Sequence, residues 1–279
     1  MSNISPGLYI VSTPIGNLND ITLRSLEVLK KSDIILCEDT RRSLKLLNHY
    51  KIKKKLISYH KFNEKKELNK IIEYLNEGKI LSLISDAGTP ALSDPGYLLI
   101  NECIIKNINV VPVPGPSSIT ASMCISGFED KFLFYGFLPK TEKELQKRLL
   151  SLQDEQFALI FFIPGTKINF YLKNFKQFFD GRNILIAREI TKLHETFYRN
   201  TVDNIKSFKT PLKGELTVVL SKKKIISKIF DNSGIKNQAI KYLKKYSLKD
   251  VVELISKSEK LSKNKIYKIC LEIKNAKNS

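Results

Sequence analysis

The sequence predicts an α/β protein made of two α/β domains and a small helical appendage. Short β-rich segments alternate with helical patterns along the first half, as in parallel βαβ units. A turn-rich segment, PVPGPSS at 112–118, interrupts this alternation before it resumes, and the pattern becomes entirely helical from about residue 235. A chain of 279 residues is long enough for two domains with cores of their own. We therefore expect domains at 1–114, 115–225 and 235–279.

The elements of the first domain follow from composition and periodicity. A strand is expected at 7–12, and then a helix from about Asp20, a suitable N-cap, to Lys30 and Lys31, whose charges suit a helix C-terminus. A later helix carries apolar residues at positions i, i+3, i+4 and i+7 and ends at Gly78. Those apolar residues are Leu68, Ile71, Ile72 and Leu75. The remaining strands are expected at 34–37, 80–84 and 110–113.

Further strands and a helical tail are expected after the turn-rich segment. The strands fall near 133–137, 157–163, 183–188 and 215–220. Apolar residues of the tail have the number and spacing to form a small independent helical core. These residues are Val251, Val252, Leu254, Ile255 and Leu261.

The formal charge of +19 indicates a polyanionic partner. A compositional bias is the alternative, because 40 of the 47 basic residues are lysine in a chain also rich in Ile and Asn. Residues 222–279 hold 16 lysines and five acids, a local charge of +11. Because the charge is concentrated, we favour nucleic-acid binding over bias.

Several classes of protein are disfavoured by what the sequence lacks. The longest apolar stretch, Phe157 to Ile163, ends at Pro164 and is far shorter than the roughly 20 residues that cross a bilayer. The N-terminal residues show no secretory signal, and the four cysteines form no C-x-x-C pair, so we expect a cytoplasmic protein. No two glycines stand two residues apart, which rules out a G-x-G-x-x-G loop. With three widely spaced histidines, no metal site is expected.

Three loops after predicted strands are candidates for a ligand site. The loop STPIGNLND at 12–20 contains Pro14 and Gly16, which favour a tight turn with exposed backbone. The loop SDAGTPALSDPG at 85–96 carries two carboxylates, Asp86 and Asp94, and is long for a βα connection. The third, PGPSSITAS at 114–122, offers hydroxyls and amides at a helix start. Ordinary turns or an interdomain hinge would also explain them.

Taken together, these loops resemble a specific family. Residues 7–41, SDAGTPALSDPG, PGPSS, YGFLPK at 135–140 and AREITKLHETFYR at 187–199 are similar to the ribosomal RNA small subunit methyltransferase I family, of the tetrapyrrole methylase superfamily. The similarity continues weakly in LSKNKIYKICLEI at 261–273. It implies two α/β domains of the tetrapyrrole methylase type with S-adenosylmethionine in the cleft between them, and a homodimer. It also implies 2′-O-methylation of a cytidine in small-subunit ribosomal RNA, as free RNA or in the assembled subunit.

The resemblance also implies which residues contact the cofactor. They are Pro14, Ser85, Asp86, Thr89, Ser117, Ser118, Ile163 and Gly214. Asp86 suits this role because a carboxylate accepts hydrogen bonds from ribose hydroxyls. The chain departs from the family at 163–167, where Ile-Pro-Gly-Thr-Lys replaces the usual Glu-Ser-Pro-His-Arg.

Methyl transfer requires a group that assists proton loss from the 2′-hydroxyl. The candidates follow predicted strands or lie in the REITKLHE motif: Glu38, Asp39, Lys192 and Glu195, and beside them Glu189, His194 and His60. Asp39 and Arg41 could instead form a structural ion pair, and either histidine could be an ordinary surface or core residue. Arg41, Arg42 and Lys192 are candidates for RNA phosphate contacts, because fork-shaped or point cations suit phosphates.

Two other functions remain open at this point. The superfamily fold would also permit a methyltransferase that acts on a tetrapyrrole or another small acceptor, although the basic tail argues against it. The altered 163–167 segment and the charge would suit an RNA-binding or ribosome-assembly protein that has lost catalysis. The intact loops argue against that function.

Overall fold

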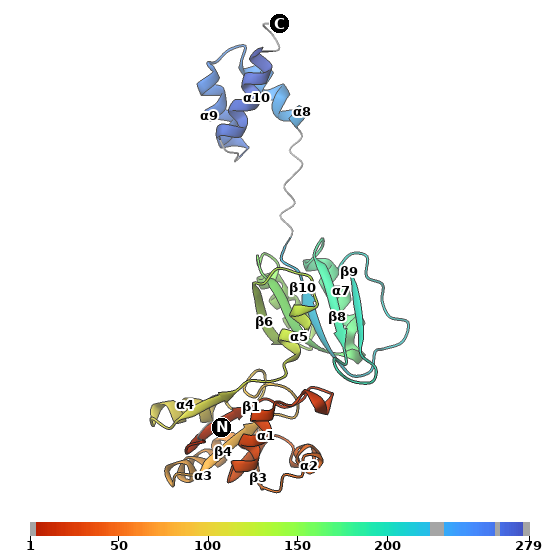
Figure 1. Cartoon of the computed structure of the whole chain (residues 1–279). Coiled ribbons are helices and arrows are strands. Elements are labelled where there is room, and N and C mark those ends of the chain that lie inside the picture. Colours follow the sequence, from red (N-terminus) through yellow and green to blue (C-terminus); the bar gives the residue numbers. More distant parts are fainter. Residues whose placement is uncertain (1–3, 224–231, 260–262, 276–279) are drawn as a thin grey trace. The chain divides into compact units, whose positions relative to one another are not determined.

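The computed structural model describes residues 4–223, 232–259 and 263–275 and divides into two compact units, residues 1–224 and 225–279. The first unit contains two five-stranded sheets with helices (Figure 1). The described residues of the second unit form three helices. The predicted α/β fold with a C-terminal helical appendage is therefore confirmed.

The first sheet is entirely parallel. Its strands are β1 (Gly7–Val11), β2 (Ile34–Cys37), β3 (Lys55–Ser58), β4 (Ile80–Ile84) and β5 (Val110–Val113), in the order β3-β2-β4-β1-β5. The helices are α1 (Leu23–Lys31), α2 (Thr40–His49), α3 (Glu64–Asn76) and α4 (Tyr97–Ile105). Two apolar clusters pack with this sheet, one around Leu8 and Ile71 and one around Val11 and Ile35. Because all five strands run the same way, the loops after them meet at one edge.

Helix α1 begins later than predicted. Asp20 is not its N-cap: this residue ends a short 3₁₀ turn, η1 (Leu18–Asp20). Thr22 is the N-cap, and its hydroxyl accepts a hydrogen bond from the Ser25 N–H at 3.0 Å. Both residue types are good caps, so local sequence alone did not distinguish them.

The second sheet is mixed. Its strands are β6 (Phe132–Phe137), β7 (Ala158–Pro164), β8 (Asn183–Arg188), β9 (Thr196–Thr201) and β10 (Glu215–Leu220), in the order β6-β7-β10-β8-β9. Strand β10 is antiparallel to both neighbours, and β6 pairs with β7 in parallel. The other elements are α5 (Ser118–Cys124), α6 (Glu142–Leu152), η2 (Gly165–Lys167) and α7 (Ile168–Phe178).

A buried arginine connects the segments at one end of this sheet, where β7 and β8 begin and β10 ends. Arg182 is 1% exposed, and its two terminal nitrogens donate to four backbone carbonyls at 2.8–3.4 Å. The acceptors belong to Gln153, Glu155, Phe157 and Ser221. One side chain thus joins the segments before β7, before β8 and after β10.

The second unit is a three-helix cluster of α8 (Asn232–Tyr242), α9 (Leu248–Ser258) and α10 (Lys263–Asn275). Val251, Val252 and Ile255 lie in its core, as predicted. Leu254 does not: it is 47% exposed, because it lies on the opposite face of α9. Leu261 lies outside the described residues. None of the helices in the described parts of the chain is long and apolar enough to cross a membrane.

Candidate functional site

The first unit contains a cavity of about 900 Å³, within the range typical of small-molecule sites. The loops after β1, β2 and β4 line it from the first sheet. The start of α5 and the ends of β7, β8 and β10 line it from the second part of the unit. The cavity therefore lies where the carboxyl ends of the parallel strands face the second sheet.

The loops after β1 and β4 brace one another. Thr13 and Gly88 exchange two backbone hydrogen bonds at 2.9 and 3.0 Å, and the Thr13 hydroxyl donates to the Ser85 carbonyl at 3.1 Å. The Ser12 and Thr89 hydroxyls lie 3.1 Å apart. Gly88 has a φ of +85°, which favours glycine. These contacts fix the backbone that faces the cavity.

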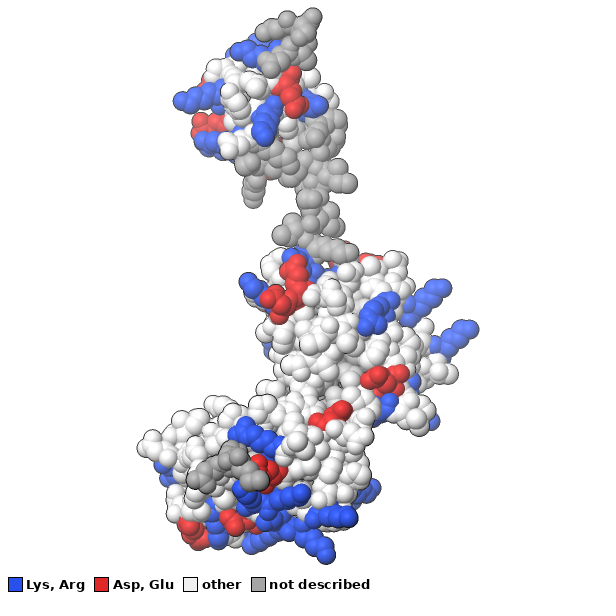
Figure 2. Space-filling view, in the orientation of Figure 1, with Lys and Arg blue, Asp and Glu red and all other residues white. Residues whose placement is uncertain are grey.

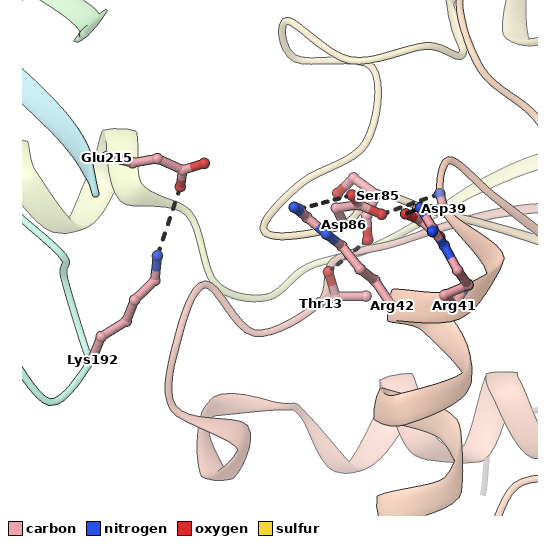
Figure 3. Close-up of polar contacts among 8 residues, drawn as sticks. All are labelled: Thr13, Asp39, Arg41, Arg42, Ser85, Asp86, Lys192 and Glu215. Carbon is pink, nitrogen blue, oxygen red and sulfur yellow. Dashed lines mark hydrogen bonds and ion pairs between the residues drawn. The ribbon is translucent and has the colours of Figure 1, made fainter. Parts of the chain in front are cut away.

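Asp86 is held by two groups from the segment after β2 (Figure 3). One carboxylate oxygen accepts from the Asp39 N–H at 3.2 Å, and the other accepts from Arg42 at 3.0 Å. Asp39 is the N-cap of α2, so the same residue that starts the helix also positions Asp86. Asp86 and Arg42 both line the cavity.

Two further carboxylates of the lining differ from ordinary surface groups. Burial, and then the neighbouring Asp86 charge, raise the pKa of Glu38. Asp94 is half-buried, and burial together with the charges of Glu38, Asp86 and Glu215 raises its pKa to about 6. Among the described residues, Asp94 forms no ion pair. A carboxyl group with this pKa can exchange a proton near neutral pH.

The wall from the second sheet is built around Glu189. Its carboxylate accepts from the Glu215 N–H at 3.1 Å and from Lys192 at 2.9 Å. Burial alone would raise the pKa of Glu189, but these two donors outweigh burial and hold the pKa below its usual value. Lys192 also lies 3.8 Å from the Glu215 carboxylate (Figure 3). Gly214 has a φ of +91°, and a Cβ at this position would overlap the Glu189 carboxylate.

Loops from the two sheets meet at Gly16. The Asn17 N–H donates to the Thr191 hydroxyl at 2.9 Å. A Cβ at Gly16 would lie 2.5 Å from the Lys192 side chain and 2.7 Å from the Thr191 hydroxyl. Glycine is therefore needed for the close approach of the 12–20 loop to the 189–195 loop.

The cavity brings together most of the residues predicted from the sequence. The eight predicted cofactor contacts all line it: Pro14, Ser85, Asp86, Thr89, Ser117, Ser118, Ile163 and Gly214. The predicted catalytic residues Glu38 and Lys192, the additional candidate Glu189, and the predicted RNA contact Arg42 also line it.

The remaining candidates lie outside this lining. Arg41 binds the Asp39 carboxylate with two side-chain hydrogen bonds and holds its pKa at about 2, so the alternative of a structural ion pair describes these two residues. Glu195 accepts from the Thr191 N–H at 2.6 Å and thereby shapes the 189–195 loop. His60 and His194 do not line the cavity either.

Sequence reasoning named Asp94 but gave it no role. Its surroundings come from β2, β4 and β10, which are distant in sequence, so the only sequence signal was its place in the long 85–96 loop.

The divergent 163–167 segment contributes mainly backbone. Ile163 and Pro164 line the cavity, and the Gly165 N–H donates to the Gly214 carbonyl at 2.9 Å. A Cβ at position 165 would lie 2.5 Å from the Leu212 carbonyl oxygen. Among the described residues, no three His, Cys, Asp or Glu side chains form a group that could hold a metal ion.

Comparison with known families matches residues 7–206 to the Tetrapyrrole (Corrin/Porphyrin) Methylases. A relative named ribosomal RNA small subunit methyltransferase I from Thermotoga maritima is 47% identical over 220 residues, which cover 77% of this chain and 98% of the relative. A relative of the same name from Haemophilus influenzae is 37% identical, with 97% of this chain and 98% of the relative covered.

Solved structures share the fold at low sequence identity. The methyltransferase CobJ superposes with a TM-score of 0.60 and 17% identity, covering 78% of this chain and 95% of that one. The uroporphyrin-III C-methyl transferase from Thermus thermophilus, complexed with S-adenyl homocysteine, gives a TM-score of 0.54 and 14% identity, covering 77% and 97%.

Proposed function

Because the chain belongs to the tetrapyrrole methylase family, and within it to the ribosomal RNA small subunit methyltransferase I proteins, we propose that it is an S-adenosylmethionine-dependent methyltransferase. Its acceptor is the 2′-hydroxyl of a cytidine ribose in small-subunit ribosomal RNA. The observation that carries this proposal is the cavity, which combines the cofactor loops with two carboxylates, Glu38 and Asp94, whose pKa values are raised.

The chemistry of the cavity fits S-adenosylmethionine. Asp86 offers a carboxylate, which accepts hydrogen bonds from ribose hydroxyls or pairs with an ammonium group. Ile119, Phe162 and Leu216 supply apolar surface for a purine ring. Gly88 and Gly214 have no side chain, so a ligand can approach the backbone closely at these two positions.

The cofactor supplies an electrophilic methyl group, so the protein's part is to bind, orient and deprotonate the acceptor. Asp94 is suited to accept the 2′-hydroxyl proton, since its pKa of about 6 leaves it ionised but basic at neutral pH. Glu38 is the second candidate, because its pKa is also raised and it lines the same cavity. Asp39 is a weak base, with its pKa near 2.

The proposal extends to partners and organisation. The RNA phosphates are contacted by Arg42 and Lys192, which line the cavity, and by Arg41, whose side chain is 86% exposed although it pairs with Asp39. The substrate is small-subunit RNA, free or in the assembled subunit. The protein acts in the cytoplasm as a homodimer, with domains at 1–114, 115–225 and 235–279. The basic residues of the second unit and the names of the relatives support the RNA substrate.

Methyl transfer from labelled S-adenosylmethionine to small ribosomal subunits tests this function. Subunits from cells that lack the gene should accept about one methyl group on a cytidine ribose, located by ribose-methylation mapping. Transfer to a tetrapyrrole instead would establish the small-acceptor alternative, which the fold of the solved relatives permits. RNA binding without cofactor binding or transfer would establish a protein that has lost catalysis.

A further inference from the structure

The net positive charge of the chain comes from two segments. Residues 222–279 carry +11, and residues 40–70 carry 11 Lys and Arg and two acids, a local charge of +9. The rest of the chain therefore has a charge of −1, although it contains 20 Lys and Arg. A uniform preference for lysine codons would not leave most of the chain neutral, so the 40–70 charge requires its own explanation.

The 40–70 segment forms one side of the first sheet. It comprises α2, the edge strand β3 with the turns that flank it, and the first half of α3. Figure 2 shows basic side chains gathered over the surface where Figure 1 places these elements. Nine of its lysines form no ion pair with any described residue. They are Lys45, Lys51, Lys53, Lys54, Lys55, Lys61, Lys65, Lys66 and Lys70. Their charge is uncompensated within the described protein.

A solvent-exposed aromatic ring lies within this basic surface. Phe62 is 95% exposed, and it follows Lys61 in the turn between β3 and α3. The turn is well ordered by its own contacts. The Asn63 side chain accepts from the His60 N–H at 2.8 Å and donates to the Ser58 carbonyl at 2.9 Å. The His60 ring contacts the Phe62 ring edge to face, with centroids 6.0 Å apart. The fold thus holds an apolar ring in solvent.

This surface borders the cavity. The turn after β3 lies at the same sheet edge as the loops that line the cavity, and the Ser58 hydroxyl donates to the Glu38 carbonyl at 3.4 Å. Two cations of the segment, Arg42 and Lys45, themselves line the cavity. A ligand that extends out of the cavity along α2 would meet the unpaired lysines.

We propose that the 40–70 surface binds single-stranded RNA, with lysines on the phosphates and an unstacked base on Phe62. Sequence-tolerant binding of single strands combines these two features, a positive track and an aromatic platform. The bound strand leads the neighbouring nucleotide into the cavity. This inference rests on the proposed function, because it takes the acceptor to be a nucleotide of an RNA strand.

The stacking part is tested with Phe62→Ala and an unstructured oligocytidylate of about ten nucleotides, a length within the usual site sizes. The control is Leu23→Ala, because Leu23 is also apolar and 86% exposed but lies on α1. Phe62→Ala should weaken binding about tenfold or more, with little change for duplex RNA, whereas the control should match wild type. If Phe62→Ala and the wild-type protein bound the single strand with equal affinity, base stacking on Phe62 would be refuted.

The phosphate part is tested with Lys51→Gln/Lys53→Gln/Lys61→Gln. The control, Lys140→Gln/Lys143→Gln/Lys147→Gln, removes the same charge from exposed positions at and before α6. Each lost phosphate contact lowers the magnitude of the slope of log affinity against log salt concentration by about 0.7. The slope of the first variant should therefore be lower than that of the wild type by about 2, and the slope of the control should be almost unchanged. Equal slopes for the two variants would refute phosphate binding by the lysines of the 40–70 surface. If the wild-type protein methylates small subunits but the two variants have equal slopes, the proposed function stands and the RNA-binding surface is refuted. If the slopes differ as expected but the wild-type protein does not methylate small subunits, only the proposed function is refuted.

Discussion

Asp94 lies at the cavity with Glu38, Asp86 and Glu215 as its charged neighbours, and burial with these charges gives it a pKa of about 6. If Asp94 accepts the 2′-hydroxyl proton, only its ionised form is active, so the rate of methyl transfer should rise with pH with a midpoint near 6. Asp94→Asn should lower the rate by roughly 10²- to 10⁴-fold. Single-turnover rates from about one pH unit below this value to about two units above it measure both effects.

Stability provides a control on the same variant. The folded-state pKa of Asp94 is raised from an ordinary 3.8, so the ionised side chain is disfavoured in the folded state and stability falls as pH rises from about 4 to about 6. Asp94→Asn should therefore melt higher than wild type at pH 7, and the difference should vanish near pH 4. If Asp94→Asn is slow but its rate still rises with a midpoint near pH 6, another group accepts the proton. Glu38→Gln is then the next substitution to measure.

Asp86 has two donors from the segment after β2, the Asp39 N–H and Arg42. We expect Asp86→Ala to weaken S-adenosylmethionine binding more than tenfold, because a buried ribose hydroxyl would lose a charged acceptor at a cost of about 1.5–3 kcal/mol. Titration calorimetry measures this, with Asp154→Ala as control since Asp154 pairs with Lys223 away from the cavity. Unchanged affinity in Asp86→Ala would remove Asp86 from the cofactor site.

At the scale of elements, Gly214 couples the start of β10 to the wall of the cavity. Gly214 and Gly181 both have positive φ, but a Cβ at Gly181 meets nothing within 4 Å, whereas one at Gly214 overlaps the Glu189 carboxylate. Gly181→Ala should cost about 1 kcal/mol from backbone strain alone. Gly214→Ala should cost at least about 2 kcal/mol and also reduce cofactor affinity, since Glu189 and Lys192 must move. Chemical denaturation and calorimetry give both values, and equal effects of the two substitutions would contradict this role.

Arg182 joins three segments of the second sheet through four carbonyls. Arg182→Met should destabilise the protein by about 3–5 kcal/mol, because a buried charged side chain and its hydrogen bonds to four backbone carbonyls are lost together. Arg199→Met is the matched control, since Arg199 is exposed and donates to one carbonyl, that of Ile125. A loss of stability no larger than that of the control would show that water replaces the guanidinium.

Strand positions were the most predictable part of the fold. The four strands expected in the first domain lie where β1, β2, β4 and β5 are found, since each is a short apolar run. The edge strands β3 and β9 were not predicted, because they are half exposed and β3 is preceded by lysines. Strand direction in the second sheet could not be inferred either, since alternation does not specify which strands run antiparallel.

The site was predictable where a residue acts through its own loop. Asp86 and Ser117 lie in loops that look polar and turn-rich in the sequence alone. The properties of Asp94 depend on neighbours from other strands, and those of Asp39 depend on its helix cap and Arg41, so only the folded chain distinguishes the two carboxylates. Phe62 was likewise indistinguishable from a core residue until its exposure was known.

At the scale of the whole molecule, residues 225–279 form a compact unit of their own, and the residues that line the cavity, up to Thr217, all belong to the first unit. Deleting residues 235–279 should leave cofactor affinity nearly intact but weaken binding to RNA and slow its methylation. The lost lysines should also make the decline of RNA affinity with salt less steep.

Methylation of assembled small subunits and the salt dependence of RNA binding decide this prediction. Calorimetry with S-adenosylmethionine serves as the control for an intact first unit. If the full and shortened proteins gave the same salt slope and the same rate, the lysines of the second unit would be solvated residues without a role in RNA binding.

The position of β10 bears on how the chain folds as it is synthesised. The first sheet is complete once residue 113 has been made, but β10, the last strand of its sheet in sequence, lies in the middle, between β7 and β8. Until residues 215–220 emerge, the nascent second sheet is two separate strand pairs with open inner edges, and such edges are prone to aggregate. A chain stopped at residue 206, where the match to the family ends, would be left permanently in that state. The newly made protein therefore depends on its final strand for solubility as well as for its core.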